Sequence, residues 1–177
     1  MADIEAPLRA QVRAAMEADF FVYEEVPGVH KHGGERIRYD VVLVPRPHLL
    51  ERGFDDGCVI VEVKYFNRDN GIKHGGRLRD MLWQCVVYSF SELHLPEREI
   101  ERPLFVLYFI GGDGVDPQYE ELFTNLRHFV SRGGVGRLEL HPKYGWAMMY
   151  GANHYFRAST GRGPQNILIK RQTGSAR

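Results

Sequence analysis

The sequence contains little cysteine and no excess of charge of either sign. Only two cysteines occur in 177 residues, Cys58 and Cys85, and both stand in apolar runs. So few cysteines exclude a disulfide scaffold and predict buried, reduced thiols in a cytoplasmic protein. The 23 basic and 23 acidic residues give a formal net charge of zero. This balance argues against binding of nucleic acid by bulk electrostatics, although it leaves room for a local basic groove.

Long hydrophobic runs, a leader peptide and repeats are also missing. No run of about 18 apolar residues and no charged-then-apolar start is present, so we expect no membrane span and no secretory signal. Hydrophobic residues make up 44% of the chain, which is enough for a substantial core. The length is that of one ordinary domain. We therefore predict a single domain over residues 1–177, with a basic carboxyl-terminal segment over residues 157–177.

The hydrophobic patterns predict a mixed α/β protein. Apolar residues at helical spacing predict an amphipathic helix over residues 6–16, and further helices over 77–93 and 117–130. The first three strands are expected to form a meander, and the strand after the second helix is expected to run parallel to its neighbour through a helical crossover. The predicted strands cover residues 20–26, 35–44, 57–66, 104–110, 137–140, 146–150 and 167–169.

The most informative local feature is a charged pair inside an apolar strand. Glu62 and Lys64 stand two residues apart in the strand predicted over residues 57–66. Because side chains alternate along a strand, this pair shares a face with Ile60, while the valines between them point into the opposite layer. Burying such charges costs several kcal/mol unless they are paired or bind a metal. The structural alternative is a simple Glu/Lys pair on the solvated face of an edge strand.

Asp40, in the preceding strand, adds a second carboxylate to this pair. Carboxylate oxygens from Asp40 and Glu62 suit a hard divalent cation, which neutralises charge on a phosphate and produces hydroxide near neutral pH. A protonated Lys64 has no lone pair for a metal, but it can sit beside the attacking water and stabilise the charge of the transition state. These residue types therefore fit the hydrolysis of a phosphodiester.

The order and spacing of these residues resemble the PD-(D/E)xK nuclease superfamily. A helix with a glutamate comes first, followed by a strand with Asp40, a strand with the Glu-x-Lys pair, and a helix bearing Gln84 and Tyr88. The resemblance covers roughly residues 5–110. Tyr39 stands where the literal motif has proline, which makes the motif less specific but removes no ligand.

This resemblance implies a restriction-endonuclease-like fold, in which a mixed β-sheet flanked by helices forms an αβββαβ core. It implies an endo- or exodeoxyribonuclease that uses Mg²⁺ or Mn²⁺ and acts on DNA, of the kind that phages and bacteria use in replication, recombination, repair or restriction. The alternative is a catalytically inactive module of the same fold that binds nucleic acid or a protein partner. The implied catalytic residues are Asp40, Glu62, Lys64 and Gln84, and the implied metal ligands are Asp40, Glu62 and Glu5.

Two glutamates compete for the place of the carboxylate on the first helix. Glu5 lies on the same helical face as Leu8 and Val12, whereas Glu17 lies at the helix end. We favour Glu5, because a residue on the packed face can reach across to the strands. An acidic residue that only interacts with the helix dipole is the alternative.

Two stretches of the chain are basic enough to meet phosphates. Residues 64–80 contain five basic and two acidic residues, and residues 157–177 contain five basic and no acidic residues. Solvation of a loop and a tail by arginines is the alternative. Because one site per chain cuts one strand, cleavage of duplex DNA favours a symmetric homodimer. The predicted contacts with DNA are Arg68, Lys73, Arg77 and Tyr88.

Overall fold

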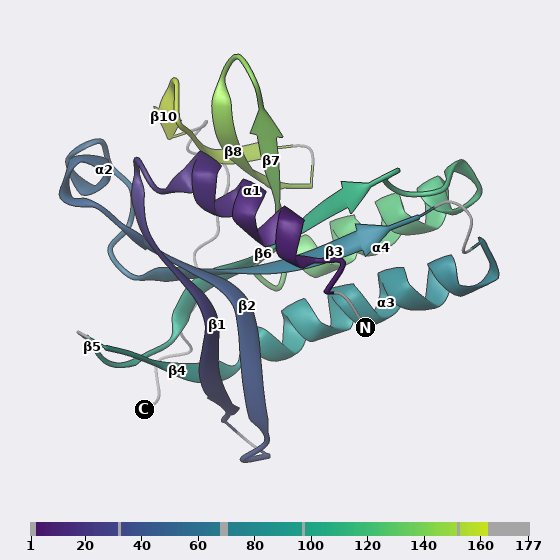
Figure 1. Cartoon of the computed structure of the whole chain (residues 1–177), viewed down its shortest axis with the longest axis horizontal. Helices are drawn as coiled ribbons and strands as arrows, with labels where there is room; N and C mark the ends of the chain where they lie inside the picture. Colours follow the sequence, from purple (N-terminus) through teal and green to yellow (C-terminus); the bar gives the residue numbers. More distant parts are fainter. Residues whose placement is uncertain (1–2, 32, 68–70, 97, 152, 163–177) are drawn as a thin grey trace.

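The computed structural model describes residues 3–31, 33–67, 71–96, 98–151 and 153–162 (Figure 1). The helices are α1 (Ala6–Met16), α2 (Pro47–Glu51), α3 (Gly71–Tyr88) and α4 (Glu120–Ser131), and Pro117–Tyr119 form a 3-10 turn. The strands are β1 (Phe20–His30), β2 (Arg36–Pro45), β3 (Cys58–Phe66), β4 (Ser91–Leu95), β5 (Arg98–Glu101), β6 (Pro103–Gly112), β7 (Val135–His141), β8 (Gly145–Tyr150), β9 (Asn153–Arg157) and β10 (Gly161–Arg162).

These strands form one mixed sheet in the order β10-β9-β8-β7-β6-β3-β2-β1-β4-β5. Strands β1, β2 and β3 are an antiparallel meander. Helix α3, followed by β4 and β5, then carries the chain to β6, which is parallel to β3, and α4 carries it to β7, which is parallel to β6. The predicted meander and parallel crossover are confirmed. The carboxyl ends of β3, β6 and β7 consequently lie at one edge of the sheet, where open α/β sheets bind their ligands.

Two apolar layers enclose the sheet. One layer packs the three valines of β3 against α1, and the other packs Ile60 and Phe66 against α3 and α4. Figure 1 shows α1 on one side of the sheet and α3 with α4 on the other. The alternation predicted for β3 is confirmed, and it places Ile60 and Glu62 on the side of α3.

The β1–β2 hairpin changes faces near the candidate site. Val22 and Leu43 pack on the α1 side, but Val26 and Tyr39 pack on the α3 side. Since residues of equal parity would otherwise share a face, the alternation is interrupted between them. Glu25 in β1 has a φ of 52°, an uncommon conformation for a residue other than glycine. The interruption therefore lies at the segment of the hairpin that carries Asp40.

The second helix differs at both ends from the prediction over residues 77–93. It occupies Gly71–Tyr88 and is called α3. A glycine at position 75 lets this helix pack closely against Tyr119, because a Cβ there would lie 3.0 Å from Tyr119 Cε1. Beyond the helix, Ser91 Oγ donates a hydrogen bond to the carbonyl oxygen of Tyr88 at 2.5 Å. The chain then continues as β4, which pairs with β1.

Several smaller elements depart from the prediction. Helix α2 and strands β4, β5, β9 and β10 were not predicted. The strand predicted over residues 167–169 lies outside the described residues, as does most of the basic segment 157–177. Within the part of the chain that the structure describes, no helix has the length and hydrophobicity needed to cross a membrane.

Candidate metal and catalytic site

Glu62 is a buried carboxylate in the interior of the sheet. Its exposed fraction is 1%, and its strand β3 lies between β2 and β6. The ammonium Nζ of Lys64 lies 2.7 Å from Glu62 Oε1. This contact engages one lone pair of a carboxylate, which has about four acceptor sites. A solvated pair on an edge strand is therefore excluded, and the carboxylate retains acceptor capacity.

Asp40 lies beside this buried carboxylate. Its Oδ2 accepts a hydrogen bond of 2.8 Å from the backbone nitrogen of Val63, the residue that follows Glu62. The β2–β3 register pairs Val41 with Val61, which is the pair next to Asp40 and Glu62. The two carboxylates therefore approach from neighbouring strands, and the backbone of β3 fixes one of them.

Glu5 reaches the same site from the start of α1. Its Oε1 accepts a hydrogen bond from the backbone nitrogen of Tyr65 at 3.4 Å, and its Oε2 lies 3.8 Å from Lys64 Nζ. Although Glu5 is the N-cap residue of α1, its side chain makes no capping hydrogen bond. Glu17 is exposed at the other end of the helix. The geometry thus places Glu5 rather than Glu17 beside the catalytic lysine candidate.

The surroundings of Glu62 and Lys64 raise the pKa of both side chains. Burial, and then the charge of Asp40, raise the pKa of Glu62 to about 7, against the opposing effect of Lys64. Burial acts to lower the pKa of Lys64, but the surrounding carboxylates, Glu62 first, outweigh it and raise that pKa. Lys64 therefore carries its proton at neutral pH and acts as a cation rather than as a base.

Helix α3 adds two buried groups that face the carboxylates. Tyr88 is 5% exposed, its ring meets that of Tyr39 edge to face at 5.0 Å, and its hydroxyl lies 3.4 Å from the carbonyl oxygen of Arg38. Burial and the charges of Glu62 and Asp40 raise the pKa of Tyr88, so its hydroxyl remains a donor. The buried thiol of Cys85 has its pKa raised by burial and by Glu62. Cys85 was not predicted as part of the site, although it precedes Tyr88 by one helical turn.

The other predicted residues are less closely tied to the carboxylates. Gln84 is half-buried on α3. Arg77 is half-buried with its Cζ 6.0 Å from the centroid of the Phe66 ring, at the end of β3. Arg68 and the side chain of Lys73 lie outside the described residues.

The carboxylates fit a hard divalent cation that is bound partly by water or phosphate. The described residues include no set of three histidine, cysteine, aspartate or glutamate side chains grouped closely enough to hold a metal. Magnesium usually takes one or two protein carboxylates and completes its shell with water and phosphate oxygens. Asp40 and Glu62 match that requirement, because they bring two carboxylates from neighbouring strands to one site.

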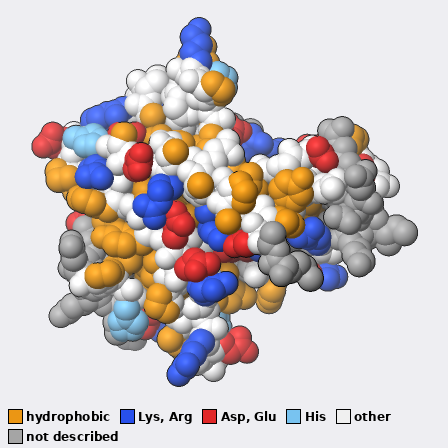
Figure 2. Space-filling model, viewed as in Figure 1, with side chains coloured by type: hydrophobic (Ala, Val, Ile, Leu, Met, Phe, Trp, Pro, Cys, Tyr) orange, Lys and Arg blue, Asp and Glu red, His pale blue; other side chains and the backbone are white. Residues whose placement is uncertain are grey.

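The surface and the comparisons with known proteins add two findings. On the face seen in Figure 2, acidic and basic side chains are interspersed rather than gathered into one basic patch. The chain matches no protein-family model, no curated protein and no solved structure. The inference of function therefore depends on the geometry and chemistry of the site.

Proposed function

We propose that this protein is a divalent-metal-dependent nuclease that hydrolyses phosphodiester bonds of DNA. The observation that carries the proposal is the meeting of Asp40, Glu62 and Lys64 in the middle of the sheet, around a buried carboxylate. With α2, β4 and β5 taken as insertions, the order α1, β1-β2-β3, α3, β6 supports an αβββαβ core of the restriction-endonuclease-like type.

Asp40 and Glu62 would hold Mg²⁺ or Mn²⁺. When bound, the cation neutralises charge on the phosphate and makes hydroxide available near neutral pH. The protein contributes the preorganisation of the carboxylates. The backbone N–H of Val63 orients Asp40, and burial keeps Glu62 away from competing water. Because a buried, charged pair of carboxylates is unfavourable alone, these two residues favour a cation between them.

Lys64 supplies the positive charge for the reacting phosphate. Its ammonium is protonated, half-buried and within 2.7 Å of Glu62 Oε1, so it can donate hydrogen bonds to phosphate oxygens or to the attacking water. Glu5 acts as a positioning residue, because its carboxylate lies 3.8 Å from Nζ and also accepts from the backbone of Tyr65. Such fixed charge is most effective in a site shielded from water.

Lys64→Ala tests the catalytic assignment. Linear, circular, single-stranded and branched DNA are each incubated with Mg²⁺, Mn²⁺ or a chelator. We expect metal-dependent cleavage by the wild type and a rate lower by about 10²-fold or more in the variant, the scale for removal of one preorganised electrostatic group. Lys31→Ala, in the exposed turn after β1, is the matched control and should cleave normally. If the wild type cleaves none of these DNA forms and no RNA with either metal, the nuclease proposal is wrong.

Metal binding gives a second readout of the same site. Titration of Mn²⁺ into the wild type, followed by calorimetry, should show binding that Asp40→Asn greatly weakens, and the metal should raise the melting temperature of the wild type by mass action. The variant keeps the size of the side chain and removes its charge. Equal binding by the two proteins would remove Asp40 from the ligand set.

A further inference from the structure

A cavity of about 510 Å³ lies between α4 and the strands β6 and β7. Its apolar wall includes Phe123 and Leu138, and its polar wall includes Tyr108, Arg127 and Arg137. The residues from β6 and β7 extend to the carboxyl ends of these strands. The cavity is therefore at the same sheet edge as Lys64, which pairs in register with Ile110 of β6.

The polar wall of this cavity offers donors that lack acceptors. Tyr108 is 2% exposed, and its hydroxyl has no hydrogen-bond partner among the described residues. Arg127 is half-buried and meets no carboxylate in the described part of the chain, and its Nε is buried without an acceptor. An unsatisfied buried donor costs about 1–3 kcal/mol. A phenol and a guanidinium that line one cavity in this state would both be satisfied by an acceptor-rich, anionic ligand.

The acidic side chains around the cavity do not provide acceptors for all of these donors. Glu139 forms an ion pair with Arg137, which engages part of a guanidinium that has five donors. The Nε of Arg137 remains buried without an acceptor among the described residues. Glu120, on the first turn of α4, is exposed. Arg127 thus remains the cation without a carboxylate partner.

The cavity is aligned with the candidate metal site across the sheet. Glu62 of β3 pairs with Tyr108 of β6, and Tyr108 pairs with Arg137 of β7. Neighbouring strands are about 4.8 Å apart, so Arg137 is roughly 10 Å from Glu62 along this row. DNA advances about 3.4 Å per nucleotide along each strand. The separation therefore corresponds to about three nucleotides.

We propose that this cavity binds a phosphate group of the DNA strand that is cut at Asp40 and Glu62. This inference rests on the proposed nuclease function and names a second point at which the enzyme holds its substrate. Phosphate has several acceptor oxygens and needs no donor from its partner. Two of its oxygens can accept parallel hydrogen bonds from the planar guanidinium of an arginine. The phenol of Tyr108 supplies a further donor at the floor of the cavity.

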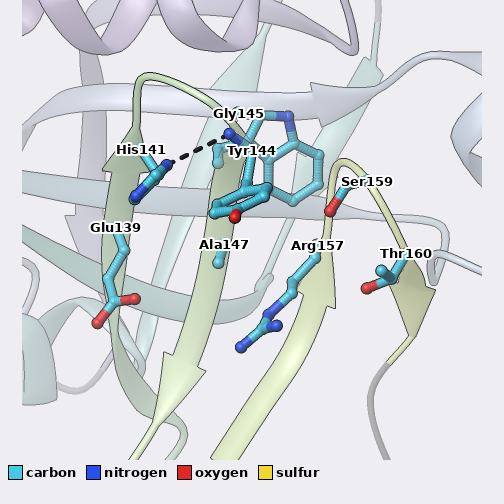
Figure 3. A pocket seen from close by; sticks show the side chains of 9 residues that line it. Glu139, His141, Tyr144, Gly145, Ala147, Arg157, Ser159 and Thr160 are labelled. Atoms are coloured by element: carbon cyan, nitrogen blue, oxygen red, sulfur yellow. Dashed lines mark hydrogen bonds between the residues drawn. The ribbon is translucent and has the colours of Figure 1, made fainter.

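A second hollow lies next to this cavity, where the bound DNA strand could continue. Its volume is about 390 Å³, and Glu139 and His141 line both hollows. Figure 3 shows Glu139 and Arg157 on either side of Ala147, on three neighbouring strands. Tyr144 borders the hollow and is 54% exposed. The Tyr144 ring stacks on that of His141 at 4.6 Å, and an exposed stack at the border of the hollow is suited to extension by a base next to a bound phosphate.

Arg127→Gln tests this assignment against Arg132→Gln, an exposed position at the end of the same helix. Inorganic phosphate is titrated by calorimetry, and DNA binding is measured at several salt concentrations. In Arg127→Gln we expect loss of phosphate binding, about tenfold weaker DNA binding, and a slope of log affinity against log salt that is smaller by about 0.7–0.9. Arg132→Gln should resemble the wild type.

The form of the DNA distinguishes a terminal from an internal phosphate. Linear oligonucleotides with a 5′-phosphate or a 5′-hydroxyl are compared with circular DNA. For a terminal phosphate, the wild type prefers the phosphorylated end and Arg127→Gln loses that preference. For an internal phosphate, the variant weakens binding of all three alike. If the variant loses inorganic phosphate but keeps its DNA affinity and salt slope, the assignment to the substrate strand is wrong.

Tyr108→Phe separates a ligand-binding role from a structural one. Removing a hydroxyl without a partner should leave the melting temperature in phosphate-free buffer unchanged or higher, and it should weaken phosphate binding. A lower melting temperature with unchanged phosphate and DNA affinity would overturn the proposal. Failure of the nuclease function has a different signature, namely DNA and phosphate binding that still require Arg127 together with no metal-dependent cleavage.

Discussion

Helices α1 and α3 cover opposite faces of the same strands, and the side chains beneath them differ in kind. Beneath α1, the ring of Phe54 packs edge to face against Phe20 at 5.3 Å and Phe156 at 5.1 Å. The polar tip of Trp146 in this layer is satisfied, because its Nε1 donates to Asp19 Oδ2 at 2.7 Å. Beneath α3 and α4, the carboxylate of Glu62 is buried with the ammonium of Lys64 2.7 Å from its Oε1, and the hydroxyl of Tyr108 is buried without a hydrogen-bond partner among the described residues.

This difference shows how one strand combines stability with chemistry. The alternation of β3 gives its valines to the α1 layer and Glu62 to the other layer. Each fully buried valine contributes roughly 1.5 kcal/mol or more, whereas a buried carboxylate costs several kcal/mol. The apolar face therefore offsets the cost of the charged one. Two faces with such separate tasks should respond differently to substitution.

The largest expected effect is on stability, from Phe20→Ala in the α1 layer. Phe20 is fully buried, so the variant should lose about 3–5 kcal/mol of unfolding free energy, measured with urea. The Mn²⁺ affinity of the folded protein should not change. Phe129→Ala, at a 77% exposed position on α4, is the control and should stay within about 0.5 kcal/mol of the wild type. Loss of metal affinity in folded Phe20→Ala protein would show that the faces are coupled.

Glu62→Gln should have the opposite effect on stability, because it removes a buried charge. The folded pKa of Glu62, about 7, lies above the ordinary value of 4.5 for a glutamate. The protonated form is therefore favoured in the folded protein, and its stabilising contribution is present below pH 4.5 and is lost as the pH rises through 7. Without metal, the wild type should lose about 3 kcal/mol from this group between pH 4 and 8.

The pH comparison requires urea unfolding of both proteins in chelator. Glu62→Gln should lack this loss, and Glu51→Gln, exposed on α2, should behave like the wild type. The same pH dependence in Glu62→Gln and wild type would mean that Glu62 is already ionised at low pH in the folded protein. Its burial would then have little energetic cost, and the contrast between the two faces would be weaker.

The local part of this arrangement could be predicted from the sequence. Alternation in β3 set the face of Glu62, and helical spacing with Leu8 indicated that Glu5 faces the sheet. The order of elements predicted the meander and the parallel crossover. Each of these inferences uses a period of a few residues, which a single sequence displays directly.

The remainder depends on contacts between distant parts of the chain. The helix predicted from residue 77 begins at Gly71, and the close approach of Tyr119 favours the glycine at position 75 within it. The interrupted alternation near Asp40 involves a pairing of two strands that no local pattern records. Tyr108 and Arg127 carry no motif and meet only because α4 folds over β6. Side chains gathered in this way have no sequence spacing to reveal them.

The smallest expected effect is in DNA binding, from Arg77→Ala. The side chain lies over Phe66 at the carboxyl end of β3, close to where Lys64 meets the reacting phosphate in the proposed mechanism. We expect weaker DNA binding and a salt slope smaller by about 0.7–0.9, the contribution of one phosphate contact, with at most about 1 kcal/mol lost from stability through the cation–π contact. Arg13→Ala, on α1, is the matched control, because its guanidinium pairs with Glu24 at 2.5 Å on the opposite face.

If both variants lower the salt slope equally, DNA contacts both faces of the sheet, and the proposed separation between a structural face and a DNA-binding face is wrong. If neither does, the phosphates bind away from α3, and the basic residues of segment 163–177 become the next positions to replace.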